Sequence, residues 1–96
     1  MLKIVAKMSV KAGHIEEFKE LAKDLIKKSR AEAGNVFYTL NQSVANENEL
    51  AFIECWKDQA AIETHKATEH FTGTLPKLAN LCENTGAIEV FNEVEF

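Results

Sequence analysis

The sequence predicts a ferredoxin-like α+β fold, an antiparallel sheet with helices packed on one face. Three observations support this fold class. The chain has 96 residues, enough for one hydrophobic core, so residues 1–96 are expected to form a single domain. Apolar residues recur with the period of strands in some segments and of helices in the segments between them. The resulting order is strand, helix, strand, strand, helical region, strand.

A change of period separates the first strand from the first helix. From Leu2 to Val10, apolar residues alternate mostly with lysines and a serine, as in a half-buried strand. From His14 onwards the apolar residues form a helical stripe, and acids in the first turn and bases in the last complement the helix dipole. Gly34 is predicted to stop this helix, because glycine readily adopts the left-handed conformation past a helix end. The stripe consists of Ile15, Phe18, Leu21, Ala22, Leu25 and Ile26.

Two β-rich runs follow, Val36 to Val44 and Leu50 to Trp56, joined by a short loop rich in asparagine. A loop of this length joins antiparallel neighbours, so the two runs are predicted to form a hairpin. The second run is apolar on both sides. This pattern is typical of a strand in the middle of a sheet that is covered on both faces.

The helical region is predicted to begin at Asp58, which can cap a helix, and to be interrupted at Thr68 or Glu69. An apolar stripe then continues across Pro76. Proline is tolerated in the first turn of a helix, where its missing N–H matters least. Pro76 is therefore predicted to lie early in a last short helix.

A turn at Asn84-Thr85-Gly86 and a strand from Ile88 to Phe96 complete the predicted fold. The sheet face without helices would need cover. A chain of this length buries only roughly 60–65% of its unfolded surface, yet 46% of its residues are apolar. Two sheets stacked face to face would cover that surface, so a homodimer is predicted.

Composition excludes several classes of partner. The formal net charge is −4 and the basic residues are spread along the chain, whereas nucleic-acid binding needs a basic patch. No apolar run approaches the roughly 20 residues of a membrane span, and the N-terminus lacks the apolar core of a signal peptide. Cys55 and Cys82 are isolated, which fits reduced thiols. We therefore expect a soluble, cytoplasmic protein that binds neither nucleic acid nor membrane.

The stretch from Phe52 to Asp58, followed by His65 and by His70-Phe71, is the candidate functional site. An acid, an indole and two imidazoles meet there at a strand-to-helix edge, where small-molecule sites are often found. His65 lies three residues after Ile62, so both are expected to face the sheet. It is a candidate general base, although a half-buried histidine often only bonds a backbone carbonyl.

Glu54 shares a strand face with Trp56, and a buried acid needs a hydrogen-bond partner. It is predicted either to orient a histidine or to tie sheet to helix. Four residues are candidate substrate contacts, although packing is the stronger interpretation for three of them, His70 being the exception. These contacts are Trp56, Tyr38, His70 and Phe71.

No metal or cofactor is predicted. His65 and His70 are five positions apart, whereas a zinc pair on one helix usually sits four apart. Glycine-rich fingerprints for a dinucleotide or a phosphate are also missing from the sequence.

The sequence resembles the antibiotic biosynthesis monooxygenase (ABM) domain family over nearly its whole length. This resemblance implies a dimeric α+β barrel of two ferredoxin-like subunits, with a pocket between sheet and helices. It also implies a quinol monooxygenase-like enzyme that uses molecular oxygen without metal or flavin. His65 would then be the base, Glu54 its orienter or a polar pocket group, and Trp56 with Phe71 the apolar walls. The matching segments are Ile4-Val-Ala6, Val10-Lys-Ala-Gly13, Phe18, Ser29-Arg-Ala-Glu-Ala-Gly34, Tyr38, Glu54-Cys-Trp56 and His65…His70-Phe71.

Relatives within the same fold leave alternatives open. The run from His65 to Phe71 is similar to one in an isomerase or processing enzyme for phosphorylated autoinducer-2, which would need a cationic anchor. A non-catalytic, dimeric small-molecule-binding module is a third interpretation. A haem-degrading branch uses an Asn, a Trp and a His at positions that here hold Met8, His65 and Leu75, so haem degradation is not expected. The substrate is not identified by the sequence.

Overall fold

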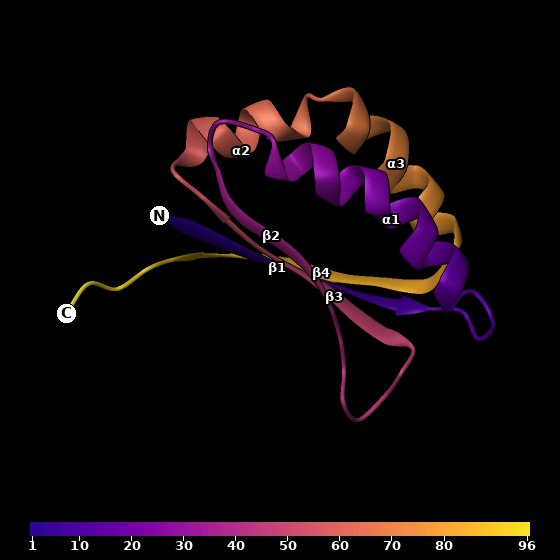
Figure 1. The fold of residues 1–96 in the computed structure, drawn as a ribbon. Coiled ribbons are helices and arrows are strands. Elements are labelled where there is room, and N and C mark those ends of the chain that lie inside the picture. Colours follow the sequence, from indigo (N-terminus) through magenta and orange to yellow (C-terminus); the bar gives the residue numbers. More distant parts are fainter.

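The computed structural model describes residues 1–96 as a four-stranded sheet with all three helices on one of its faces (Figure 1). This arrangement confirms the predicted ferredoxin-like fold. None of the helices has the length and hydrophobicity that crossing a membrane demands. In chain order the elements are β1 (Leu2–Val10), α1 (Ile15–Arg30), β2 (Asn35–Gln42), β3 (Glu49–Trp56), α2 (Gln59–Lys66), α3 (Glu69–Asn80) and β4 (Cys82–Asn92).

The strands follow the order β2-β3-β1-β4, and every neighbouring pair is antiparallel. The hairpin prediction is confirmed, and β3 is an inner strand as expected. Ala6 of β1 lies opposite Phe52 of β3 and Ile88 of β4. Because opposite residues share a face of the sheet, this register places the apolar residues of the inner strands beneath the helices.

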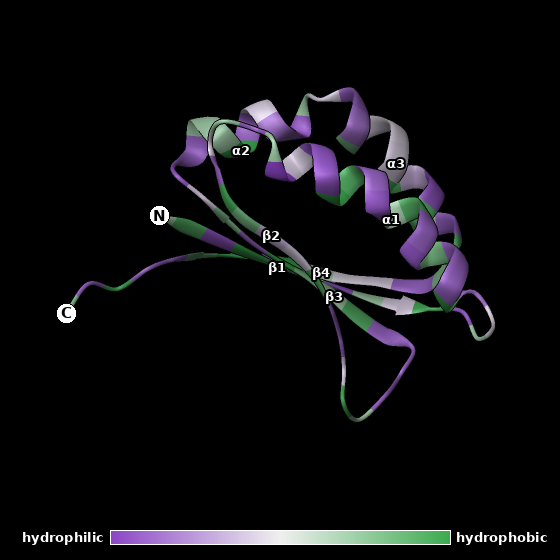
Figure 2. Ribbon diagram, viewed as in Figure 1, coloured by the Kyte–Doolittle hydropathy of each residue, from purple (hydrophilic) through white to green (hydrophobic).

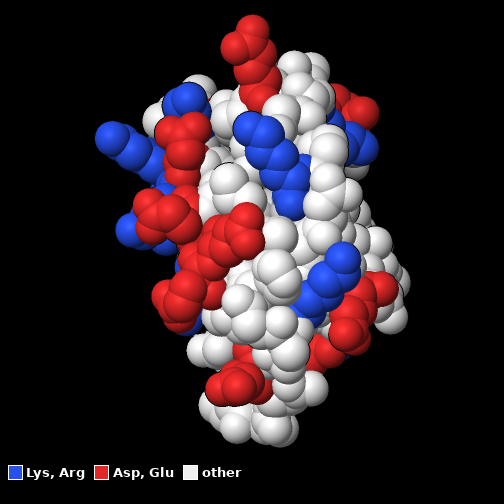
Figure 3. Space-filling model, turned by 90° about the vertical axis from the view of Figure 1, so that its right-hand side faces the viewer, with Lys and Arg blue, Asp and Glu red and all other residues white.

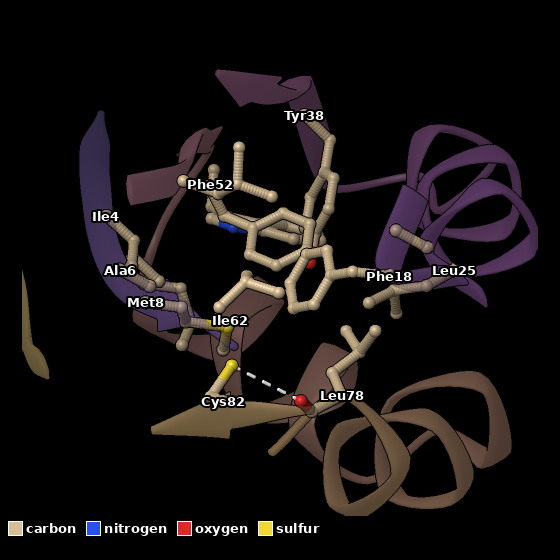
Figure 4. Packing of buried hydrophobic residues seen from close by; sticks show 14 residues of the cluster. Ile4, Ala6, Met8, Phe18, Leu25, Tyr38, Phe52, Ile62, Leu78 and Cys82 are labelled. Atoms are coloured by element: carbon tan, nitrogen blue, oxygen red, sulfur yellow. Dashed lines mark hydrogen bonds between the residues drawn. The ribbon is translucent and has the colours of Figure 1, made fainter. Parts of the chain in front are cut away.

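The core lies between the inner strands and helices α1 and α3. Figure 4 shows Phe18 of α1 and Leu78 of α3 on one side, with Phe52 and Tyr38 of the sheet on the other. The ring centroids of Phe18 and Phe52 are 6.2 Å apart, and those of Tyr38 and Phe52 are 5.6 Å apart. Offset aromatic contacts of this kind add to the free energy of apolar burial. Two of these aromatic residues, Tyr38 and Phe52, also line the candidate site described below.

Part of the sheet stays uncovered in the single chain. Figure 2 shows hydrophobic residues along the strands, whereas the helices alternate between hydrophobic and hydrophilic residues. Ile88 of β4 is 66% exposed and Phe91 is 49% exposed. The accessible surface is 6046 Å² for 10.8 kDa, compared with roughly 5,500 Å² for a typical monomer of this mass. The chain therefore exposes more total surface than is typical for its mass, and large apolar side chains of β4 are part of it.

The predicted role of Gly34 is wrong. Helix α1 ends earlier, at Arg30, and Gly13 is the one residue with a positive φ. Gly34 is needed instead for close packing, because a Cβ atom there would lie 2.4 Å from the Cβ of Ala61 in helix α2. The sequence pattern could not reveal this contact, because it joins segments that are distant along the chain.

Two predictions about the last third of the chain are also wrong. Pro76 lies inside α3 rather than early in a separate helix, because that helix begins at Glu69 after the Thr68 cap. The Thr68 side chain accepts a hydrogen bond from the Phe71 N–H, at 3.2 Å. Residues 84–86 are not a turn but belong to β4, where a shift of register against β1 absorbs the irregularity. The strand ends at Asn92.

We expect Gly34→Ala to lower the free energy of unfolding by roughly 1–3 kcal/mol, because the new methyl group overpacks the contact with Ala61. Gly73→Ala is the matched control. It lies in α3 with nothing within 4 Å of the new Cβ, so it should raise stability by up to about 1 kcal/mol. Urea unfolding followed by circular dichroism measures both. Equal effects in the two variants would contradict the close approach at Gly34.

Candidate functional site

A small cavity of about 80 Å³ lies between the sheet and the helices α2 and α3. Nine of its twelve lining residues are hydrophobic, and the others are Glu54, His65 and Lys66. A wider groove of about 320 Å³ shares Ala6, Met8, Leu75 and Ile88 with the cavity. The two hollows thus form one apolar site with few polar groups, the usual composition of a small-molecule site.

His65 reaches the cavity from the last turn of α2. The start of this helix is set by Asp58, whose side chain accepts a hydrogen bond of 2.9 Å from the Ala61 N–H. The imidazole is 2% exposed and packs against the Trp56 indole in a tilted arrangement, with ring centroids 4.5 Å apart. Phe71 packs edge-on against it at 4.9 Å. Aromatic neighbours therefore fix the orientation of the ring.

Glu32, in the turn between α1 and β2, binds the histidines. Its Oε2 lies 2.7 Å from Nδ1 of His65 and 2.8 Å from Nε2 of His70. Because a carboxylate only accepts hydrogen bonds, both nitrogens carry the N–H in the neutral rings. Nε2 of His65 then holds a lone pair, and this atom is buried without a partner. His65 lines the cavity and Glu32 does not, so we place Nε2 on the cavity side.

Burial lowers the pKa of His65, and the carboxylate of Glu32 opposes this shift only in part. The imidazole is consequently neutral at pH 7. A neutral imidazole with a fixed tautomer and a free Nε2 is equipped to accept a proton from a ligand in the cavity.

Glu54 is a polar group of the cavity and does not orient a histidine. Its Oε1 accepts a hydrogen bond of 2.9 Å from Nε1 of Trp56, on the same strand. Burial raises the pKa of Glu54 to about 7, the Trp56 hydrogen bond opposes this shift, and the charge of Glu32 adds to it. The role of orienter, one of two alternatives predicted for Glu54, belongs to Glu32. At neutral pH, Glu54 can therefore both give and take a proton.

The predicted substrate contacts divide into two groups. Tyr38 and Phe71 line the cavity, whereas Trp56 is fully buried behind His65 and His70 is bonded to Glu32. Burial and the nearby Glu54 carboxylate raise the pKa of Tyr38 far above its usual value, so its hydroxyl keeps its proton. The structure thus brings four of the six predicted residues to the cavity: Tyr38, Glu54, His65 and Phe71.

Sequence reasoning missed Glu32. It lies in a turn held by backbone hydrogen bonds from Glu32 N–H to Ser29 and from Asn35 N–H to Glu32. No periodicity sets the direction of a side chain in such a turn. The available signal was indirect: a buried histidine needs a partner, and Glu32 belongs to the Ser29–Gly34 segment that carries part of the family resemblance.

The residues of this site lie within the part of the chain that is similar to known proteins. The family model described as "Antibiotic biosynthesis monooxygenase" matches residues 1–76, a range that includes Glu32, Glu54, His65 and His70. A Bacillus subtilis protein named "Putative monooxygenase YcnE" is 42% identical over 77 residues, which cover 80% of this chain and 81% of that protein.

Solved structures share the whole fold. A conserved protein from Methanosarcina mazei Go1 superposes with a TM-score of 0.94 at 29% identity, covering 97% of this chain and 92% of that one. A crystal structure described as antibiotic biosynthesis monooxygenase superposes with a TM-score of 0.92 at 32% identity, covering 99% and 100%. The likeness therefore extends through α3 and β4, beyond the residues that the family model matches.

We expect the stability of the protein to depend on pH through Glu54. Burial raises its pKa from 4.5 to about 7, so the native state keeps a proton that the unfolded chain releases above pH 4.5. The stability from this group is complete below pH 4.5 and is lost as the pH rises through 7. Between pH 5 and 8, the wild type should lose free energy of unfolding, on the order of 3 kcal/mol, relative to Glu54→Gln.

Urea unfolding at pH 5 and pH 8 measures this difference. Glu47→Gln, in an exposed loop, is the control and should follow the wild type at both values. A difference between wild type and Glu54→Gln that does not change with pH would contradict the raised pKa.

Proposed function

We propose that this chain, which belongs to the antibiotic biosynthesis monooxygenase family, oxidises a small quinol or hydroxylated aromatic. The oxidant would be molecular oxygen, and no cofactor would be needed. One observation carries this proposal. A neutral imidazole, held by a carboxylate on one side, directs its free nitrogen toward an apolar cavity. Such a group removes a phenolic proton without the substrate having to enter water.

The proposed reaction begins when Nε2 of His65 takes the proton of a substrate hydroxyl. The resulting phenolate is electron-rich and passes one electron to O₂, giving a substrate radical and superoxide. These combine to form a carbon–oxygen bond in a peroxide, which protonated His65 protonates. The ring carbon that carries the peroxide then loses its hydrogen as a proton while the O–O bond breaks, which leaves one oxygen on that carbon as a carbonyl and releases the other as water. Counted on the keto tautomer of the hydroxylated ring, a CH₂ group becomes C=O, a four-electron oxidation that matches the four-electron reduction of O₂.

Glu32 and Glu54 support this chemistry in different ways. The Glu32 carboxylate stabilises the imidazolium that forms when His65 takes the proton. Glu54, with a pKa of about 7, is suited to move a second proton at neutral pH. The surrounding apolar residues exclude water and strengthen both interactions.

The size of the site restricts how a substrate binds. The cavity of about 80 Å³ is smaller than the roughly 300–1,000 Å³ of typical ligand pockets, whereas the adjoining groove has about 320 Å³. We therefore propose that the reacting hydroxyl group enters the cavity beside His65 and that the rest of the substrate lies in the groove, across Leu75 and Ile88.

The two alternative functions predict different behaviour. An isomerase for a phosphorylated carbonyl compound needs a free cation at the site. Lys66 lies 3.2 Å from Glu63 in an ion pair, so Lys7, which lines the groove, would have to be that cation. That reaction would also proceed without oxygen. A non-catalytic binding module would bind a ligand without consuming it, and the small volume of the cavity is the observation in its favour.

We also propose that the chain functions as a homodimer through the sheet face opposite the helices. Phe37, Cys55, Lys3 and Phe91 form one cross-strand row on this face. Phe37 is 36% exposed and Phe91 is 49% exposed in the single chain. Pairing this face with its copy would remove apolar area from water, which is favourable by about 25 cal/mol per Å².

We expect size-exclusion chromatography with light scattering to give twice the chain mass of 10.8 kDa. Phe91→Glu should give the mass of one chain, because a charge would be buried in the interface. Val44→Glu is the control, since Val44 is an apolar residue at a fully exposed loop position and the substitution should keep the dimer. A dimer in both variants would contradict the proposed face.

We expect the purified protein to consume oxygen with reduced naphthoquinols or hydroxylated anthrones, without added metal or flavin. His65→Ala should lower the rate roughly hundredfold or more, the usual contribution of a general base. His14→Ala is the matched control, because His14 also pairs with a glutamate, at 3.2 Å, but lies at the surface just before α1, far from the cavity lining. An oxygen electrode with boiled protein as blank measures the rate.

Two outcomes would count against these assignments. Full activity in His65→Ala would show that another group is the base. No oxygen uptake by the wild type across the panel would contradict the proposed reaction, and phosphorylated carbonyl compounds and direct binding assays would then distinguish the two alternatives.

A further inference from the structure

We propose that Glu32, His65 and His70 form a binding site for one divalent transition-metal ion, with Zn²⁺ as the best-suited ion. One ligand atom from each residue lies within 4.8 Å of the others. The three residues come from the α1–β2 turn, the end of α2 and the start of α3. The spacing rule for zinc pairs on one helix does not apply to them, because α2 ends at Lys66 and His70 belongs to the next helix.

The donor set matches zinc chemistry. Two imidazoles and one carboxylate are the protein ligands of known zinc sites that keep a fourth position open. The Glu32 oxygen lies 2.7 Å from Nδ1 of His65 and 2.8 Å from Nε2 of His70. Bonds of about 2.0–2.2 Å in a tetrahedron separate ligand atoms by about 3.4 Å. Each of these two contacts would thus need to open by less than about 1 Å, a movement within reach of side-chain rotations.

Unsatisfied polar atoms give a second, independent reason. Oε1 of Glu32 is buried and has no hydrogen-bond partner, although Oε2 of the same carboxylate accepts from both imidazoles. A buried carboxylate oxygen without a partner costs free energy. A bound ion would be shared by both oxygens and would remove this cost. Glu32 and His70 are each 13% exposed, so an ion can reach the cluster from solvent.

The local charge also favours a cation. Most acidic side chains that form ion pairs on the helices pair with a lysine. On the face of the molecule seen in Figure 3, acidic and basic side chains lie close together. Glu32 differs, because its ion-pair partners are only the two histidines. The negative charge of Glu32 also raises the pKa of Glu54 within the buried site. A divalent ion would therefore neutralise charge that lysines neutralise elsewhere.

Metal binding would change His65. A metal at Nδ1 displaces the proton from that nitrogen, so in the neutral ring the N–H moves to Nε2. Nε2 would then donate a hydrogen bond into the cavity and could no longer accept a proton. If the proposed function holds, Zn²⁺ is accordingly an inhibitor of it. This consequence rests on the proposed function, whereas binding of the metal does not.

The test is a titration of chelator-treated protein with ZnCl₂, without substrate, by calorimetry and by competition with a chromophoric chelator. We expect one Zn²⁺ per chain. His70→Gln and Glu32→Gln should each weaken binding at least tenfold, since each removes one of three ligands. His14→Gln, at the exposed pair with Glu17, should bind like the wild type. Circular dichroism verifies that each variant is folded.

Substitution with Co²⁺ identifies the ligands, because Cys55 and Cys82 are free thiols. Visible d–d bands of a four- or five-coordinate ion, without a thiolate charge-transfer band, are expected for the proposed site. No saturable binding, binding of equal strength in His70→Gln and Glu32→Gln, or a thiolate band would each overturn the proposal. If Zn²⁺ binds as expected and the wild type shows no oxygen uptake, the metal site stands and only the proposed function fails.

Discussion

The hydrogen bonds that Glu32 accepts from His65 and His70 join three parts of the chain that the sequence keeps apart. They link the turn after α1, the last turn of α2 and the first turn of α3. One oxygen atom thereby fixes which nitrogen of each imidazole faces the carboxylate and ties the end of α2 to the start of α3. The free nitrogen of His65, the proton transfer proposed for it and the proposed metal site all depend on this carboxylate.

The buried carboxylate of Glu32 raises the pKa of a neighbouring buried acid, Glu54. Glu54 is also buried, and its pKa of about 7 reflects burial together with the charge of Glu32. Two carboxylates in one buried site are unfavourable for folding, and part of this cost is offset by the hydrogen bonds from Trp56 and the histidines. Perturbed groups of this kind are typical of functional sites, where stability is lowered in favour of chemistry.

The aromatic layer beneath the site supplies the rigidity that these groups require. Trp56 packs against the His65 ring and donates a hydrogen bond to Glu54, so one fully buried indole contacts two titratable side chains. Tyr38 packs against Phe52 and against the His65 ring. Side chains fixed by close packing lose their conformational freedom during folding and not during ligand binding, which lowers the entropic cost of binding a ligand in the cavity.

The sequence by itself determined the fold class, the strand order of the hairpin and the residues that face the helices. Periods of two and 3.6 are local properties that any chain segment carries. For the same reason the sequence placed His65 on the sheet-facing side of its helix and Glu54 on the same strand face as Trp56. It failed where the direction of a side chain or the shape of the backbone depends on distant neighbours.

Only the tertiary structure decided that Glu32, not Glu54, binds His65, that Gly34 makes room for Ala61 and that α3 continues through Pro76. Glu32 lies 33 positions before His65, in a turn where no repeating pattern sets the direction of its side chain. The partner of a buried group is chosen by three-dimensional packing, and a one-dimensional pattern records only that such a partner must exist.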